Sequence, residues 1–427
     1  MFHRYRLSNG IEVISEPMEN RKTVALGIFI KVGSQDETRK NNGISHLTEH
    51  MFFKGTTTRS AKDIADLTAS LGDDVNAFTS KECTALYGMT ITEKLDELAD
   101  LLGDLVANAK FDSKDLAKEK RIVMDEIDMY EDSPEDLVHE LLQKRVWRDD
   151  ALGFLISGTK SIVHSLHSEE LHQFLKEYYY AENMLISAAG GYAEEILKDC
   201  LERAFAGVKI KGERKKELCI TPDYHRSFAS ANKKIEQIHL NLAFPALCIG
   251  DERRFVYSVF NSVFGGSNNS RLFQQIREEE GMAYSVYSYG SAYQRAGLFH
   301  IDITVQPSLA VSVLKKVVGI IEEFVGRELT KEELFLHKQQ VETELIMSSE
   351  SPKTRMDANA KFALAGTKIY TLEEKLARIE AINCEEMQSL AAEILSLKDA
   401  SLCIVGEKSS TDLRGLRKIW EGWSLFR

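Results

Sequence analysis

The sequence predicts an α+β protein made of two homologous α/β-sandwich domains, each an antiparallel-rich sheet covered by helices. Two observations predict this fold class. Hydrophobic residues recur at the spacing of strands and of helices in successive segments, and the same order of segments occurs twice along the 427 residues, which indicates an internal duplication. The composition, 43% hydrophobic and 28% charged, is that of a folded protein and excludes disorder, a collagen-like fibre and a disulfide-stabilised miniprotein.

The first half opens with strand patterns at 7–17 and 23–32, where the Asn9-Gly10 dipeptide favours a turn because it tolerates positive φ. Residues 75–92 return to the period of two that is typical of strands. We expect the other elements of this half to be, in chain order, helices at 43–54 and 60–71, a helical tract at 93–147 broken at Ser133-Pro134, a helix at 168–179, a strand at 183–191 and a helix at 193–206.

The same order begins again in the second half, and a strand closes each half. The charged segment 208–230 contains Gly and Pro and has no sustained period, so we interpret it as the linker between an N-terminal domain at 1–207 and a homologous C-terminal domain at 231–427. The elements expected beyond the linker are a strand at 237–246, helices at 251–264 and 270–280, a hairpin at 285–306 and a closing strand at 401–408.

The charge balance excludes several classes of partner. A net charge of −12 opposes attraction to phosphate backbones and anionic lipids. No stretch approaches the roughly 18 to 20 apolar residues that cross a bilayer, and no secretory signal is evident. The six cysteines form no CxxC pair, which argues against a disulfide framework and a thiolate zinc site. We therefore expect a cytoplasmic protein that binds neither nucleic acid nor membrane.

The sharpest local signal is the pentapeptide HLTEH, in which His46 and His50 are four residues apart and Glu49 lies between them. On a helix, positions i, i+3 and i+4 share a face, so the two imidazoles and the carboxylate point into one small volume. Two neutral imidazoles suit zinc, and a carboxylate beside a ligand can accept a proton from the attacking water. The order inverts the HExxH motif, and the inverted form also occurs in zinc peptidases. The alternative is an amphipathic helix with incidental histidines.

A catalytic zinc site needs a third protein ligand, and the acidic tract FDSKDLAKEKRIVMDEIDMYEDSPED is the candidate source. Glu119 and Glu126 are seven residues apart, which places them on one face of a helix. Spacing alone does not choose among the five acidic candidates, which are Glu119, Asp125, Glu126, Asp128 and Glu131. For most of them a solvated acidic face is the alternative.

The segments from LSNGIEVI to SLCIVGE resemble the pitrilysin/insulysin (insulinase) family of inverzincin zinc metallopeptidases, in particular the half-length branch that includes the mitochondrial processing peptidase and its bacterial homologues. The resemblance covers essentially the whole chain. It implies that Glu126, which follows His50 by 76 positions, is the third ligand of one Zn²⁺ per chain. It also implies that Glu119 supports catalysis without binding the metal.

Two further segments match motifs of that family. VNAFTSKECTALY resembles the edge strand that meets the substrate, where Asn76 and Ala77 would bind an extended peptide. SRLFQQIREEEGMAYSVYS resembles the Arg/Tyr motif of the C-terminal domain. The resemblance implies that Arg277 and Tyr284 donate hydrogen bonds to a peptide carbonyl and to the oxyanion that forms on attack.

The resemblance therefore implies a zinc-dependent metalloendopeptidase that cleaves extended peptides or unfolded segments, with Glu49 as general base. A half-length chain closes the reaction chamber of this family only by pairing, so we expect a homodimer in which Arg277 and Tyr284 reach the partner's zinc, although a heterodimer with a related subunit is also compatible. Two alternatives remain open: a non-catalytic peptide-binding or structural subunit of a heterodimeric processing peptidase, and a metal-dependent amidohydrolase that acts on small molecules.

Overall fold

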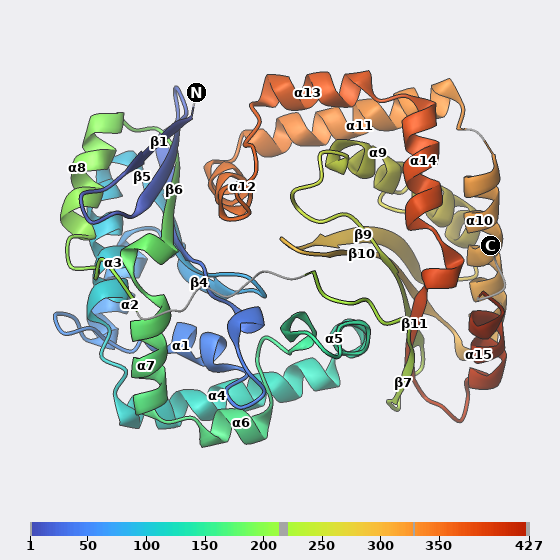
Figure 1. The fold of residues 1–427 in the computed structure, drawn as a ribbon, viewed down its shortest axis with the longest axis horizontal. Coiled ribbons are helices and arrows are strands. Elements are labelled where there is room, and N and C mark those ends of the chain that lie inside the picture. Colours follow the sequence, from blue (N-terminus) through green and yellow to red (C-terminus); the bar gives the residue numbers. More distant parts are fainter. Residues whose placement is uncertain (1, 213–220, 328, 424–427) are drawn as a thin grey trace. The chain divides into compact units, whose positions relative to one another are not determined.

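The computed structural model describes residues 2–212, 221–327 and 329–423. The chain divides into two compact units, and most of their helices and strands are labelled in Figure 1. The first unit consists of Met1–Asp128, Phe154–Leu218 and Met347–Ile369, and the second of Met129–Gly153, Cys219–Ile346 and Tyr370–Arg427.

These units differ from the contiguous domains expected at 1–207 and 231–427. Helix α5 (Pro134–Val146) comes from the first half of the sequence but belongs to the second unit, and α12 (Pro352–Leu364) comes from the second half but belongs to the first. Each of the two helices packs on the sheet of the unit that contains it. The amphipathic pattern of a helix predicts that it is covered, but it does not predict which sheet covers it.

The first unit is built on a six-stranded sheet with the order β1-β2-β6-β3-β5-β4. The pair β2 and β6 is parallel, and the other neighbours are antiparallel. The strands are β1 (His3–Arg6), β2 (Glu12–Pro17), β3 (Thr23–Ile30), β4 (Val75–Thr79), β5 (Thr84–Ile91) and β6 (Met184–Gly190). The helices that begin in this unit are α1 (Ile44–Phe52), α2 (Ala61–Ser70), α3 (Leu95–Asn108), α4 (Ser113–Asp132), α6 (Lys160–Ser165), α7 (Ser168–Tyr178), α8 (Glu194–Ala204) and α12.

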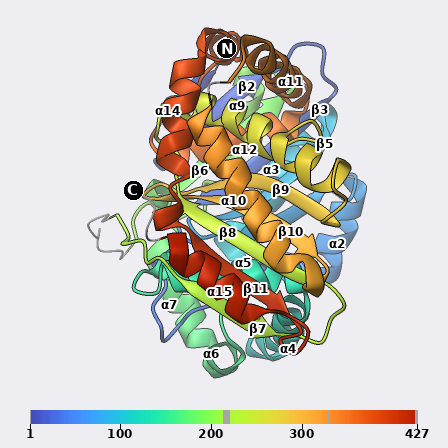
Figure 2. The same ribbon diagram turned by 90° about the vertical axis from the view of Figure 1, so that its right-hand side faces the viewer.

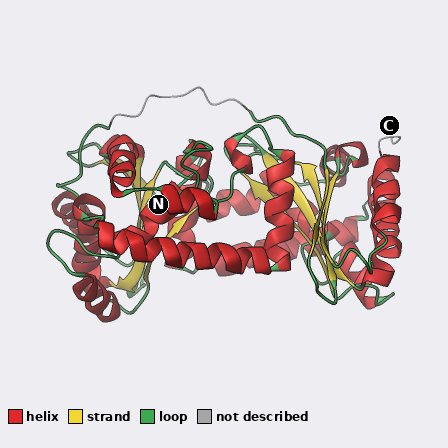
Figure 3. Cartoon of the chain, turned by 90° about the horizontal axis from the view of Figure 1, so that it is seen from below, coloured by secondary structure: helices red, strands yellow, loops and turns green. Residues whose placement is uncertain are grey.

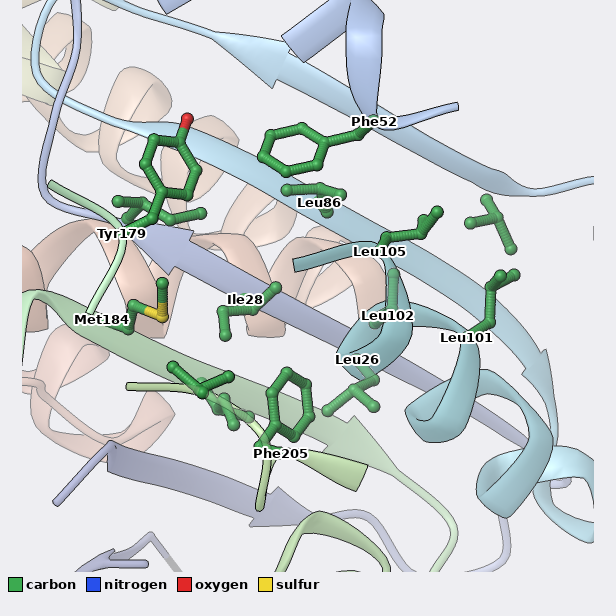
Figure 4. Packing of buried hydrophobic residues seen from close by; sticks show 14 of the residues in the cluster. Leu26, Ile28, Phe52, Leu86, Leu101, Leu102, Leu105, Tyr179, Met184 and Phe205 are labelled. Carbon is green, nitrogen blue, oxygen red and sulfur yellow. The ribbon is translucent and has the colours of Figure 1, made fainter. Parts of the chain in front are cut away.

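Successive side chains along each strand point to opposite faces of this sheet, so an apolar layer forms on each face. On one face, α3 contacts β3 and β5, and Figure 4 shows its leucines packed over Leu26 and Ile28 of β3. Burying one such side chain stabilises the fold by roughly 2 kcal/mol. On the other face, α12 contacts β2, β3 and β6 through Met356, Ala360 and Ala363.

The second unit is built on a five-stranded sheet with the order β7-β11-β8-β10-β9. Its strands are β7 (Phe228–Asn232), β8 (Ile238–Pro245), β9 (Ser285–Ala292), β10 (Gly297–Val305) and β11 (Ser401–Gly406). The pair β7 and β11 is parallel and the other neighbours are antiparallel, so the pairing scheme equals that of the first sheet without β1. The equal scheme confirms the two α+β domains of one topology that the repeated element order predicts.

Helices cover both faces of the second sheet. Helix α5 packs on one face through Val138, Leu142 and Val146. Figure 2 shows α10, α14 and α15 in front of the other face, and Figure 3 shows the strands of each unit between helices. The helices beyond α5 are α9 (Arg254–Phe264), α10 (Ala310–Gly326), α11 (Lys331–Ser349), α13 (Leu372–Ala381), α14 (Cys384–Ile394) and α15 (Leu413–Gly422).

The helical tract expected at 93–147 contains three helices, α3, α4 and α5. The break at Ser133-Pro134 is confirmed, because the Ser133 hydroxyl accepts a hydrogen bond from the N–H of Asp136 and Pro134 occupies the first turn of α5. A second break, which the sequence pattern does not predict, includes Phe111, whose φ of 50° lies in the left-handed region.

The structure also differs from the sequence-based expectation in two segments, one at each end of the first half. The strand expected at 7–17 begins only at Glu12, because the chain turns at Asn9-Gly10, where Gly10 has a φ of 95°, and joins β1 to β2. Of the linker expected at 208–230, residues 213–220 lie outside the described residues, and residues 228–230 belong to β7, which is held by parallel pairing with β11. Within the described part of the chain, no helix is both long and apolar enough to cross a membrane.

Candidate metal centre

Helix α1 carries the HLTEH motif, and its apolar residues fix its orientation. Ile44, Leu47 and Met51 are buried in the core of the first unit, while Glu49 and His50 are only half-buried. This amphipathic pattern turns the polar face of α1 away from the apolar core. The helix expected at 43–54 is therefore confirmed with bounds of Ile44–Phe52.

Helix α4 supplies the carboxylates that face α1. Leu116, Val123 and Ile127 anchor α4 in the core of the first unit. Glu119 and Glu126 are the two acidic residues whose carboxylates contact the histidines of α1. Asp125, Asp128 and Glu131 are exposed.

His46, His50 and Glu126 form a compact group of metal-ligand atoms. Oε2 of Glu126 lies 3.6 Å from Nε2 of His46 and 3.5 Å from Nε2 of His50. The three ligand atoms lie within 4.8 Å of one another, and no other group of this kind occurs among the described residues. Ligand atoms about 2.1 Å from one tetrahedral zinc ion are about 3.4 Å apart, close to the two separations from Glu126, and two imidazoles with one carboxylate are a donor set that zinc accepts.

The charges around the group favour a cation. Burial, together with the neighbouring His50, lowers the pKa of His46 to about 4, so this imidazole is neutral at pH 7 and can offer its nitrogen lone pair. Burial also opposes protonation of His50, but hydrogen bonding to Glu126 and the charge of Glu49 outweigh it and raise the pKa of His50. A bound metal ion would supply a positive charge that these carboxylates stabilise.

Glu49 is not part of the three-residue ligand group. Its Oε2 accepts a hydrogen bond of 2.6 Å from the hydroxyl of Thr79, at the end of β4. Burial raises the pKa of Glu49, and the Thr79 hydrogen bond partly offsets this effect. A carboxylate with a raised pKa beside a metal group is suited to accept a proton and return it.

Glu119 contacts the other nitrogen of His50. Its Oε2 lies 3.3 Å from Nδ1 of His50, and its Oε1 lies 2.9 Å from Nζ of Lys54. A hydrogen bond on the second nitrogen of a metal-ligating histidine fixes the tautomer and the orientation of the ring. The structure thus places Glu119 where it can hold His50 without belonging to the ligand group.

The segment expected to bind substrate begins with β4, which is an edge strand of the first sheet and pairs with β5. Asn76 is exposed, and its Oδ1 accepts a hydrogen bond from the N–H of Ala77. The same strand ends at Thr79, the partner of Glu49. An edge of this kind can pair with an extended peptide close to the metal group.

Arg277 and Tyr284 lie together in the second unit. Nη1 of Arg277 donates a hydrogen bond of 2.6 Å to the carbonyl oxygen of Tyr284, and the guanidinium lies 5.9 Å from the centre of the Tyr284 ring. Tyr284 is 68% exposed. The helix expected at 270–280 contains a π-helical turn at Phe273–Glu278, a geometry often found at functional sites.

The sequence motifs did not indicate two residues that contact the site. Thr79 lies in the predicted edge strand, two residues beyond Ala77, and Lys54 follows His50 by four residues. Lys54 lies two residues beyond the end of α1 and contacts Glu119, so helical spacing gave no signal for it. The contact of Thr79 with Glu49 could not be predicted without knowing how β4 packs on α1.

Two family models match this chain. Residues 12–160 match "Insulinase (Peptidase family M16)", and residues 165–341 match "Peptidase M16 inactive domain". The chain is 37% identical over 409 residues to an "uncharacterized zinc protease" of Bacillus subtilis, covering 95% of this chain and 98% of that protein. It is 32% identical over 415 residues to an "uncharacterized zinc protease" of Rickettsia felis, covering 97% of this chain and 99% of that protein.

Solved structures share the fold over the whole chain. The structure titled as the peptidase M16 inactive domain from Pseudomonas fluorescens has a TM-score of 0.88 at 19% identity and covers 96% of this chain and 99% of that one. A protease from Helicobacter pylori has a TM-score of 0.87 at 18% identity, with 95% and 99% covered. Fold and site define a two-domain α+β protein with an HxxEH motif, the inverse of HExxH. The chain belongs to the insulinase family, peptidase family M16, and is of the half-length type.

Proposed function

We propose that this protein is a zinc-dependent metalloendopeptidase that cleaves extended peptides or unfolded segments. One Zn²⁺ per chain would be held by His46, His50 and Glu126. The observation that carries the proposal is the convergence of these three side chains within 4.8 Å, with Glu49 beside them and outside the group. The zinc protease names of the relatives in Bacillus and Rickettsia support the same chemistry.

When bound, zinc polarises the scissile carbonyl and makes water a better nucleophile at neutral pH. Glu49 is the general base: its carboxylate accepts a proton from the attacking water and then returns it to the leaving amine. Thr79 orients that carboxylate through its hydroxyl. Glu119 orients His50 through Nδ1.

The substrate would bind along the edge of β4. Main-chain pairing with Asn76 and Ala77 recognises an extended backbone and makes few demands on its side chains, which suits a peptidase for unfolded segments. Arg277 and Tyr284 would donate hydrogen bonds to a peptide carbonyl from the partner subunit of a homodimer. A heterodimer with a related subunit is the other arrangement that serves this purpose, and we place either one in the cytoplasm.

Profiling of a peptide library by mass spectrometry tests this function. We expect cleavage within peptides, loss of cleavage on chelation, recovery with zinc, and no cleavage by Glu49→Gln. Cleavage that survives both the chelator and Glu49→Gln contradicts the proposal. Hydrolysis of small amides without cleavage of any peptide favours the amidohydrolase alternative.

One observation favours a second candidate. The model that matches residues 165–341 is named for an inactive domain, which is compatible with a non-catalytic peptide-binding or structural subunit of a heterodimeric processing peptidase. The metal group lies in the part of the chain that matches the other model, which favours the catalytic function. A protein that binds peptides but hydrolyses none, alone and with zinc, would establish the second candidate.

A further inference from the structure

Glu37 is a buried carboxylate in the loop that leads into α1. Its side chain accepts three hydrogen bonds: Oε2 from the N–H of Gly43 at 2.7 Å and from Nδ2 of Asn42 at 2.8 Å, and Oε1 from the N–H of Ser45 at 2.8 Å. It is only 5% exposed. Burial raises the pKa of Glu37 to about 7, which these hydrogen bonds oppose. A buried carboxylate is unfavourable unless hydrogen bonds or a paired charge compensate it, and Glu37 accepts three hydrogen bonds.

Glu37 caps α1 from outside the helix. The first N–H groups of a helix lack partners within it, and a side chain at the capping position usually supplies one. The capping residue of α1 is Gly43, which has no side chain. Its φ of 100° favours glycine, and a Cβ at this position would meet the carbonyl oxygen of Ser157 at 2.7 Å. The carboxylate of Glu37 therefore performs the capping that Gly43 cannot.

The first turn of α1 contains His46, whose ring lacks the support that His50 has. Nδ1 of His50 contacts Glu119, whereas Nδ1 of His46 is buried and has no hydrogen-bond partner among the described residues. Metal-ligating histidines are normally oriented through that second nitrogen. The direction of Nε2 in His46 therefore depends on the backbone that carries it, and Ser45, the preceding residue, donates its N–H to Glu37.

The loop that contains Glu37 is also bound to the turn that follows β4. The N–H of Ser34 donates to the carbonyl of Ser80, and the N–H of Gln35 donates to the carbonyl of Lys81. These carbonyls directly follow Thr79, the partner of Glu49. A path of hydrogen bonds thus joins the turn after β4 to the first turn of α1 through this loop.

We propose that Glu37 is a positioning residue of the metal centre: it caps α1 and thereby fixes the backbone of His46 relative to Glu126 and to the strand that holds Glu49. This inference rests on the proposed function, because it assumes that the group formed by His46, His50 and Glu126 binds zinc. It adds a residue that contacts neither the metal ligands nor the substrate strand through its side chain.

Zinc affinity, measured by competition with a chromophoric chelator, tests the inference without a peptide assay. Glu37→Ala removes all three acceptor contacts, and we expect the zinc dissociation constant to rise about 10- to 100-fold. Glu37→Gln has the same shape and keeps one acceptor oxygen, so we expect a smaller rise. Because Glu37→Ala can fail to fold, circular dichroism is recorded first, and Glu37→Gln then decides the question.

Ser60→Ala is the matched control, because Ser60 caps α2 in the same unit and accepts a hydrogen bond from the N–H of Asp63. We expect this variant to lose thermal stability but to keep its zinc dissociation constant within twofold. The inference is overturned if folded Glu37 variants bind zinc as tightly as the unaltered protein, or if the unaltered protein binds no zinc. If the unaltered protein binds zinc, the Glu37 variants bind it weakly and no peptide is cleaved, the inference stands and the proposed function fails.

Discussion

Glu119 holds His50 at 3.3 Å through Nδ1, while Nε2 of the same ring faces Glu126 at 3.5 Å. The imidazole is thus held between two carboxylates of one helix. Only Glu126 joins the ligand group. The seven-residue separation of the two glutamates places one beside each nitrogen of the ring, and we propose that they act differently there.

Replacement of Glu119 tests whether this residue orients His50 without binding the metal. We expect Glu119→Ala to weaken zinc binding about 10- to 100-fold, because the ring of His50 loses the partner that orients it. Glu119→Gln should lose less, since its amide oxygen can still accept from Nδ1. Asp125→Ala on the exposed side of α4 serves as the control and should bind zinc normally. Equal affinities for Glu119→Ala and the control, measured by chelator competition, would refute the orienting role.

The hydroxyl of Thr79 favours ionisation of Glu49. Burial raises the pKa of Glu49, and the hydrogen bond from Thr79 partly offsets this rise. Thr79→Val removes the hydroxyl and keeps the shape, so the pKa of Glu49 rises further. A general base must be ionised to act, and we therefore expect the acidic limb of the kcat/KM profile to move to higher pH. Thr79→Ser keeps the hydroxyl and should keep the profile. If the acidic limb of the Thr79→Val profile does not move, Thr79 does not influence the ionisation of Glu49.

A partly buried ion pair attaches α12 to the first sheet: the Glu16 side chain is 10% exposed and the Arg355 side chain is 25% exposed. Arg355 Nη1 donates to Oε1 of Glu16, and Nδ2 of Asn359 donates to Oε2 of the same carboxylate at 2.8 Å. Arg355→Met leaves Glu16 buried without its cation, so we expect a loss of about 3 kcal/mol in the free energy of unfolding. The double variant Glu16→Leu/Arg355→Met removes both charges and should be less destabilised. Chemical denaturation that finds the single variant as stable as the unaltered protein would exclude this role.

The proposed homodimer predicts complementation between two inactive chains. Glu49→Gln lacks the base and Arg277→Ala lacks the substrate contact. If Arg277 acts on the partner's metal centre, a mixed dimer contains one complete site. Random pairing of equal amounts should then recover about a quarter of the activity of the unaltered protein. Peptide hydrolysis by the mixture, compared with each variant alone, measures this recovery. Hydrolysis no greater than that of the separate variants would contradict action between subunits.

The sequence predicted the local part of the site but not its tertiary part. His46, Glu49 and His50 could be placed because their spacing on one helix determines that they share a face. Spacing could not separate Glu126 from the other acids of α4, since that choice depends on how α4 packs against α1; only the family resemblance indicated it. Glu37 gave no signal, because it caps a helix that begins several residues later, beyond a glycine.

For the fold too, the sequence predicted local features but not all of the tertiary packing. The repeated order of strands predicted two sheets of one topology, and the pairing of β2 with β6 and of β7 with β11 confirms it. The exchange of α5 and α12 between the units could not be predicted, because an apolar helix face specifies burial and not a partner.

Zinc titration of the metal-free protein, with peptide hydrolysis followed at each addition, tests the central claim most directly. The account predicts that hydrolysis rises with zinc and reaches its maximum at one zinc per chain. Glu49→Gln should take up the same amount of zinc and hydrolyse no peptide, because Glu49 lies outside the ligand group. Hydrolysis that is independent of zinc, or a Glu49→Gln variant as active as the unaltered protein, would contradict the account.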